Sequence, residues 1–149
     1  MTSEFTVAVH GLVYLNHHEG QVYSSEALAE NVCTNPARIR KIMAKLKRAG
    51  FVETREGKQG GYTAVDGCGG ISLCQVAEAL GESFVSASWK SGNADMECLI
   101  ASGMGAAMEK VFEELDRLCR ERLTKITIAD VDREVTGHGR ENQADDCGR

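Results

Sequence analysis

The first half of the chain alternates apolar residues at a helical period with capping and turn residues. Phe5, Val9, Leu12 and Val13 fall at positions i, i+4, i+7 and i+8, so one apolar face follows the helical repeat. This spacing predicts a helix over residues 5–17.

Two further helices are predicted from their capping residues. Ser24 supplies an N-cap oxygen for a helix over residues 25–32, and Asn35 caps a third helix. The third helix begins at Pro36, where no backbone donor is lost, and Gly50 is suited to its end. Its buried side is formed by four apolar residues at the helical period, Ile39, Ile42, Met43 and Leu46.

A β-hairpin is predicted directly after the third helix. Residues 51–55 and 61–65 are rich in Phe, Val, Thr and Tyr, and the loop EGKQG between them is rich in Gly. Ser72 then caps a fourth helix that ends near Leu80. Helices followed by a basic helix and a hairpin (the wing) form a winged helix-turn-helix domain over residues 1–80. The expected fold class is therefore mainly α with a small β-hairpin (α+β), followed by a long C-terminal dimerisation helix.

The second half of the chain holds one long periodic segment between two irregular ones. We expect a sensory loop over residues 81–103, a dimerisation helix and a short packing segment over 104–131, and a polar, disordered tail over 132–149. The apolar stripe of the long helix is typical of a dimer seam, although a helix packed on its own domain or on a heterologous partner has the same pattern. Its members are Met104, Met108, Val111, Phe112, Leu115 and Leu118.

Positive charge is concentrated in one stretch of an acidic chain. Residues 35–62 carry eight basic and two acidic side chains, a balance of +6, whereas the whole chain has a net charge of −5. A compact positive face on an acidic protein indicates a polyanionic partner, and a winged helix indicates double-stranded DNA. A basic amphipathic helix can also be a solvated face, but the capped helix before it and the Gly-rich hairpin after it favour DNA binding.

The predicted geometry assigns roles to the residues of this positive face. Ala37, Arg40 and Lys41 lie in the first half of the third helix, nearest the bases of the major groove, whereas Lys45 and Arg48 are better placed for phosphates. The expected DNA-binding residues are Ser24, Ser25, Ala37, Arg38, Arg40, Lys41, Lys45, Arg48, Arg55, Lys58, Gly60, Gly61 and Tyr62.

Other functional classes find little support in the sequence. No run of about 18 apolar residues occurs, and the apolar N-terminus lacks the basic region of a signal peptide. We therefore expect a cytoplasmic protein without a membrane span. No Ser-His-Asp order, HExxH or phosphate-binding GxxxxGK motif occurs, so we expect no enzyme activity.

Four segments occur in an order that is typical of one family. They are NPARIRKIMAKLKRAGFV, the wing EGKQGGY, ISLCQVAEAL and the late ITIADV, and with the first helix they span residues 5–131. In these segments the chain resembles the Rrf-two (Rrf2) family of bacterial winged-helix transcription regulators. The resemblance implies a homodimer that reads a palindromic operator, and we expect a repressor that responds to a redox or small-molecule signal. Family members often carry Arg directly before the first wing Gly, where this chain has Glu56 after Arg55. Insertion of the wing into the minor groove is therefore a weaker expectation than insertion of the helix.

Several members of this family hold an iron–sulfur cluster on three cysteines in the loop before the long helix. This chain has only Cys98 in that loop, so we expect a member without a cluster or other cofactor, with a cluster-sensing regulator as the alternative. Cys98 is the sensing candidate because the resemblance places it where relatives sense their signal, with an inert packing role as the alternative. Asp95 and Glu97 nearby are expected to raise its pKa. The other cysteines are expected to lie in the core (Cys33), to be structural (Cys68, Cys74, Cys119) or to have no role (Cys147).

Overall fold

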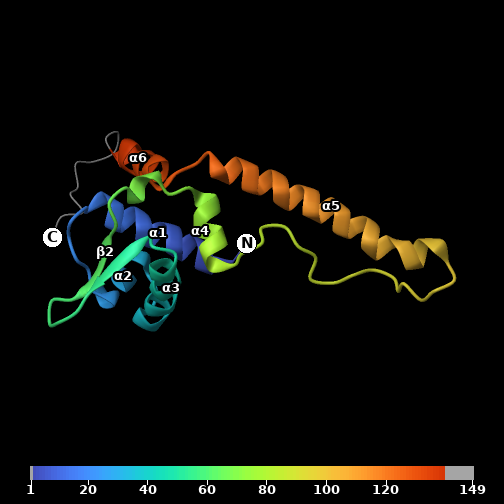
Figure 1. Ribbon diagram of the computed structural model, residues 1–149, viewed down its shortest axis with the longest axis horizontal. Helices are drawn as coiled ribbons and strands as arrows, with labels where there is room; N and C mark the ends of the chain where they lie inside the picture. Colours follow the sequence, from blue (N-terminus) through green and yellow to red (C-terminus); the bar gives the residue numbers. More distant parts are fainter. Residues whose placement is uncertain (1, 140–149) are drawn as a thin grey trace.

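The computed structural model describes residues 2–139, which form a helical body from which one long helix extends (Figure 1). The described chain is mainly helical with one two-stranded hairpin, which confirms the expected fold class. The elements follow in the order α1 (Ser3–His17), α2 (Ser25–Val32), α3 (Pro36–Arg48), β1 (Val52–Arg55), β2 (Gly61–Ala64), the 3-10 helix η1 (Cys68–Gly70), α4 (Leu73–Leu80), α5 (Leu99–Thr124) and α6 (Ile128–Gly139).

The three expected N-caps are present and set where α2, α3 and α4 begin. The Ser24 hydroxyl accepts a hydrogen bond from the Ala27 N–H at 3.1 Å, and the Asn35 side chain accepts one from the Arg38 N–H at 2.8 Å. Ser72 forms a reciprocal capping box with Gln75 at the start of α4. Each cap satisfies backbone donors that the first helical turn leaves free.

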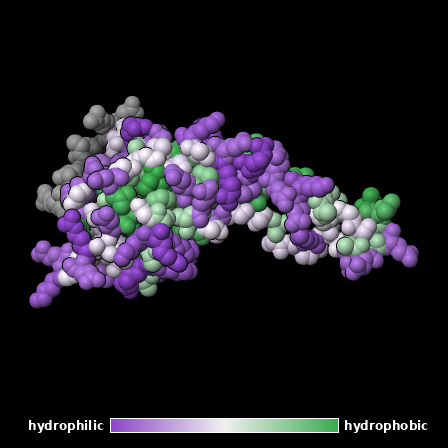
Figure 2. Space-filling model, viewed as in Figure 1, coloured by the Kyte–Doolittle hydropathy of each residue, from purple (hydrophilic) through white to green (hydrophobic). Residues whose placement is uncertain are grey.

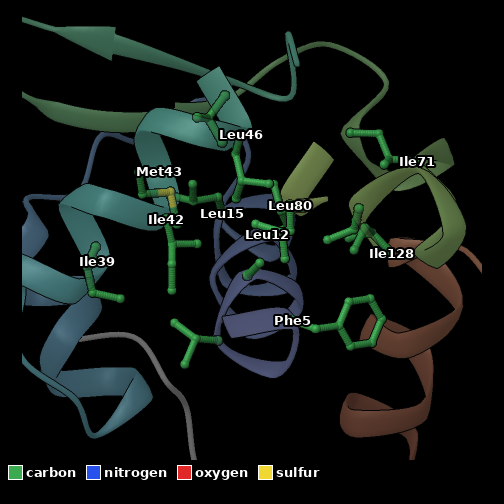
Figure 3. Close-up of a cluster of buried hydrophobic side chains, with 14 of the residues drawn as sticks. Phe5, Leu12, Leu15, Ile39, Ile42, Met43, Leu46, Ile71, Leu80 and Ile128 are labelled. Carbon is green, nitrogen blue, oxygen red and sulfur yellow. The ribbon is translucent and has the colours of Figure 1, made fainter. Parts of the chain in front are cut away.

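The hydrophobic core is organised around α1, which packs against α2, α3, α4 and α6. Leu12 and Leu15 of α1 are buried, and Figure 3 shows the apolar side of α3 facing them. The core is completed by Phe5, Ile39, Ile42, Met43, Leu46, Ile71, Leu80 and Ile128. Burial of these side chains fixes the face that α3 turns towards solvent.

The hairpin is joined to the segment before α2 by a third, short β-interaction. β1 and β2 pair in antiparallel register, with Val52 opposite Ala64. Tyr23 forms an isolated antiparallel bridge with Tyr62 of β2. The wing is therefore anchored at its base to the N-terminal end of α2.

The expected boundary between loop and long helix is wrong by five residues. We expected a loop over residues 81–103, but α5 begins at Leu99 and continues through Gly103 and Gly105. The preceding segment runs beside α5 (Figure 1) and is tied to it by an ion pair between Lys90 and Glu109. These small residues interrupt the apolar period, which is why the pattern hides the first turn of the helix.

The expected packing segment and tail also differ from the structure. Residues 126–131 contain the start of α6, which runs to Gly139 and packs on α1 and η1, so the polar tail does not begin at residue 132. Ile128 is fully buried, and its N–H donates to the Ile71 carbonyl at 2.9 Å. The rest of the expected tail, including Cys147, lies outside the described residues.

Among the helices of residues 2–139, none is both long and apolar enough to cross a membrane.

Candidate nucleic-acid interface

The outer face of α3 carries small side chains at its centre and positively charged side chains along its length. At about 100° per residue, Ala37, Lys41, Ala44 and Arg48 lie opposite the buried side of the helix. All four are exposed. The two alanines allow another backbone to approach closely, while Lys41 and Arg48 supply the charge.

One flank of α3 faces the first turn of α1. The carboxylate of Glu4 accepts a hydrogen bond from Lys45 at 2.7 Å and from Lys41 at 3.0 Å. These two ammonium groups, Lys45 first, lower the pKa of Glu4 to about 2. Arg38 on the same flank donates to the hydroxyl of Ser3. Lys45 was expected to contact phosphates and Lys41 to contact bases. Both are thus held by Glu4, an acidic residue that the sequence pattern did not indicate.

The other flank of α3 faces α2 and β1. Arg40 donates to the Ser25 hydroxyl at 3.1 Å and lies 3.5 Å from the Glu26 carboxylate. Ser25 is buried and donates to Glu26, so its hydroxyl is already used within the protein. Lys47, which the sequence reasoning also omitted, is exposed and donates to Thr54 of β1 at 2.8 Å.

The wing places two basic side chains beside the N-terminal end of α2. Arg55 and Lys58 are exposed and line an open cleft together with Tyr23, Ser24 and Gly60. The Ser24 hydroxyl accepts the capping bond at the N-terminal end of α2, a position that favours a phosphate.

The wing glycines are required by the protein's own backbone. A Cβ added at Gly61, where φ is +153°, would lie 2.1 Å from the Tyr23 carbonyl oxygen, and one at Gly60 would lie 2.3 Å from the Arg55 carbonyl oxygen. Tyr62 is half-buried, and this burial raises its pKa. The wing glycines thus allow close backbone approaches within the wing and towards Tyr23.

The apolar stripe of α5 is open to solvent in the single chain. α5 buries no residue, and Val111, Leu115 and Leu118 are each more than 40 % exposed. Figure 2 shows hydrophobic side chains at the free end of this helix, where Leu99 and Ile100 are exposed. Of the six expected dimer residues, Met104, Val111, Leu115 and Leu118 are exposed, and Met108 and Phe112 are partly covered.

The cysteines differ from their expected environments at two positions. Cys33 is exposed rather than part of the core, because it ends α2 in the left-handed conformation with φ of +60°. Cys98 is exposed at the N-cap of α5, and the N–H groups of Ala101 and then Ile100 hold its pKa below the ordinary value. The expected rise from neighbouring carboxylates is therefore wrong. Cys68 is buried, which raises its pKa to about 11.

The described residues do not assemble a metal site. Within residues 2–139, no group of three or more His, Cys, Asp or Glu side chains could hold a metal ion. Cys98 lies at the free end of α5, whereas Cys68 and Cys74 are buried in the body of the protein.

Comparison with known proteins identifies relatives of one kind. Residues 1–134 match the protein family described as Rrf2, iron-dependent transcriptional regulator. YwnA of Bacillus subtilis, assigned as an HTH-type transcriptional regulator, is 28% identical over 134 residues, which cover 88% of this chain and 96% of YwnA. A crystal structure from Lactobacillus plantarum, assigned as a transcriptional regulator, is 27% identical with a TM-score of 0.79, covering 93% of each chain. CymR, the global cysteine regulator of B. subtilis, shares the fold at a TM-score of 0.67 and 16% identity, covering 90% of this chain and 96% of CymR.

Proposed function

The chain belongs to the Rrf2 family of transcriptional regulators, and we propose that it is a homodimeric repressor that binds a palindromic DNA operator. In this proposal residues 1–80 bind DNA, residues 81–98 receive a signal, and α5 holds the dimer together.

The outer surface of α3 supports the proposal that the protein binds DNA. Its alanines at positions 37 and 44 leave room for base edges between positive side chains, as a helix in the major groove requires. Arg40 lies at the border of this surface, where its guanidinium can exchange Glu26 for the edge of a guanine. Arg55 and Lys58 on the wing reach the same side of the molecule as Ser24 and supply contacts to the adjacent backbone.

The solvent-exposed stripe of α5 supports the proposal of a dimer. A 26-residue helix with an open apolar stripe needs a partner to remove that stripe from water. Two copies joined along α5 would carry two α3 helices related by a twofold axis, which matches a palindromic operator with half-sites about one or two helical turns apart.

Cys98 supports a redox signal rather than an iron signal. Its exposure and its position at the N-terminus of α5 favour the thiolate, which is the form that peroxide oxidises to sulfenic acid. The family description mentions iron, but the donor groups of the described residues do not fit an iron–sulfur cluster, which needs three or four converging thiolates.

Selection from a random duplex library tests the proposed function. We expect the purified chain to enrich a twofold-symmetric site, and we expect Ala37→Glu to abolish enrichment by placing a carboxylate at the centre of the outer face. The matched control is Ala106→Glu, the same substitution at an exposed position of α5. Recovery of unenriched sequences by a folded, dimeric wild-type protein would refute sequence-specific binding.

A further inference from the structure

The first turn of α1 lies between α3 and the segment that follows α4. Ser3 and Glu4 contact α3, through Arg38 and through the two lysines described above. The backbone N–H of Thr2 and the ring of Phe5 instead contact residues 82 and 84. One helical turn therefore touches both the proposed DNA-reading helix and the start of the proposed signal-receiving segment.

The second set of contacts is specific in geometry. The Thr2 N–H donates to the Glu82 carboxylate at 3.1 Å. The rings of Phe5 and Phe84 stack edge to face, with centroids 5.3 Å apart and an interplanar angle of 86°. Glu82 is buried, so its carboxylate has few alternatives to this arrangement.

Residues 82–85 are in turn fixed to α5 by one carboxylate and one guanidinium. Asp116 accepts hydrogen bonds from the N–H groups of Phe84 at 2.7 Å and Val85 at 3.0 Å. Arg120 pairs with Asp116 at 2.8 Å, donates to the Glu82 carbonyl and lies 5.7 Å from the centre of the Phe84 ring. A displacement of α5 or of this segment therefore acts on Phe84 directly.

From this arrangement we propose that Glu4 is an internal counter-charge that limits DNA binding by Lys41 and Lys45, and that α5 and residues 82–85 set its position through Phe84 and Phe5. The proposal rests on the proposed function, since it assigns a control to the same DNA-binding surface. It adds a residue that determines specificity and a physical connection to the segment where a signal would arrive.

Electrostatics gives the direction of the effect. While Glu4 is hydrogen-bonded to both lysines, a phosphate must compete with a carboxylate for them, and binding that depends only on charge is weakened most. Base contacts by Ala37 and Arg40 do not involve Glu4, since Arg40 pairs with Ser25 and Glu26, so specific binding is weakened less. Loss of the Phe84–Phe5 contact lets the first turn of α1 move, and a hydrogen bond of 2.7 to 3.0 Å is lost with a shift of about 1 Å.

Titration of Glu4 in the absence of DNA tests the connection. We expect the side-chain ¹³C shift of Glu4 in the full chain to report a carboxylate down to about pH 3, in line with its lowered pKa. In Phe84→Ala the midpoint should rise towards the ordinary value of 4.5, and in Trp89→Ala, an exposed aromatic residue of the same segment, it should stay unchanged. If Phe84→Ala does not fold, Asp116→Asn removes the same anchor. An unchanged Glu4 midpoint in a folded variant would overturn the connection.

Binding to random duplex DNA tests the counter-charge. We expect Glu4→Gln to raise the affinity about fivefold to tenfold at 0.1 M salt and to steepen the log–log salt dependence by about one, because one further phosphate is neutralised. Phe84→Ala should act in the same direction, and should add nothing in the Glu4→Gln background. Glu113→Gln, an equal change of charge on α5, is the control. Affinity that Glu4→Gln leaves unchanged would refute the role of Glu4.

These measurements separate the two proposals. A wild-type chain that binds no DNA refutes the proposed function, whereas the titration of Glu4 still decides whether Phe84 positions it. A wild-type chain that binds its operator, with Glu4 insensitive to Phe84→Ala, refutes only the connection.

Discussion

Tyr23 and Tyr62 exchange two backbone hydrogen bonds, with N···O distances of 2.9 and 2.8 Å. The bridge ties the extended residues before α2 to β2 of the wing. It brings Ser24 at the start of α2 next to the basic side chains of the wing, so the two elements form one surface. Backbone pairing thus helps to set the position of α2 relative to the wing.

Gly61→Ala tests how far the wing depends on this bridge. The new Cβ would collide with the Tyr23 carbonyl oxygen, so the bridge must open, and we expect a loss of about 2–4 kcal/mol in the free energy of unfolding in urea. Gly103→Ala is the control, because it lies in α5 with no atom near the added Cβ, and it should stabilise the protein by about 0.5–1 kcal/mol. Equal stabilities of the two variants would show that the close approach at Gly61 is not required.

Arg40→Ala tests base reading by α3. We expect the variant to bind the selected operator at least about tenfold more weakly, since a bidentate contact to guanine contributes about 1–3 kcal/mol. Its binding to random DNA should change much less. Fluorescence anisotropy at fixed salt measures both. Arg117→Ala removes an arginine that is paired with Glu114 and Glu121 on α5, and should change neither affinity. Equal losses of Arg40→Ala on both DNAs would assign Arg40 to phosphate contacts.

Leu115→Lys tests the dimer seam. A charge at the centre of the exposed stripe should convert a dimer to a monomer in sedimentation equilibrium and lower operator affinity about tenfold or more, because two half-sites are no longer read together. Glu113→Lys places the same side chain on α5 outside the stripe and should remain dimeric. A dimer that survives Leu115→Lys would place the interface elsewhere.

Cys98→Ser tests the sensing thiol. Because the helix N-terminus lowers its pKa, Cys98 should be alkylated by iodoacetamide at neutral pH, and peroxide should change operator affinity of the wild type but not of Cys98→Ser. Cys33→Ser, which removes another exposed thiol, should respond to peroxide as the wild type does. If wild type and Cys98→Ser respond alike, the signal enters elsewhere.

Asp116→Asn tests whether Asp116 anchors residues 82–85, through the pH dependence of the free energy of unfolding. The backbone N–H of Val85 and the guanidinium of Arg120 lower the pKa of Asp116 to about 2 from an ordinary 3.8, so the folded state favours the carboxylate. The resulting stabilisation is present above about pH 4 and is lost as the pH falls towards 2. We therefore expect Asp116→Asn to lower the free energy of unfolding by about 1–2 kcal/mol at pH 7 and by little at pH 2.

A matched substitution separates this effect from a change in net charge. Asp95→Asn, at an exposed position between α4 and α5, should stay within about 0.5 kcal/mol of the wild type at pH 7. A pH-independent loss in Asp116→Asn would mean that packing rather than charge anchors the segment.

Local signals predicted the body of the fold well. The starts of α2, α3 and α4 follow from Ser24, Asn35 and Ser72, since a cap acts on N–H groups within three residues of it. The start of α5 and the extent of α6 were missed, because Gly103 and Gly137 weaken the helical pattern although each lies within a continuous helix. The sequence pattern was therefore least reliable where glycine interrupts a helix.

The sequence by itself determined the class of protein, through the basic helix, the glycine hairpin and the order of its motifs. Only the tertiary structure decided that Glu4 holds Lys41 and Lys45, and that Gly61 is needed opposite Tyr23. The physical reason is the distance along the sequence over which each kind of interaction acts. Helix periods and caps act over about four residues, whereas these charges and backbones meet only because burial of the core around α1 brings distant segments together.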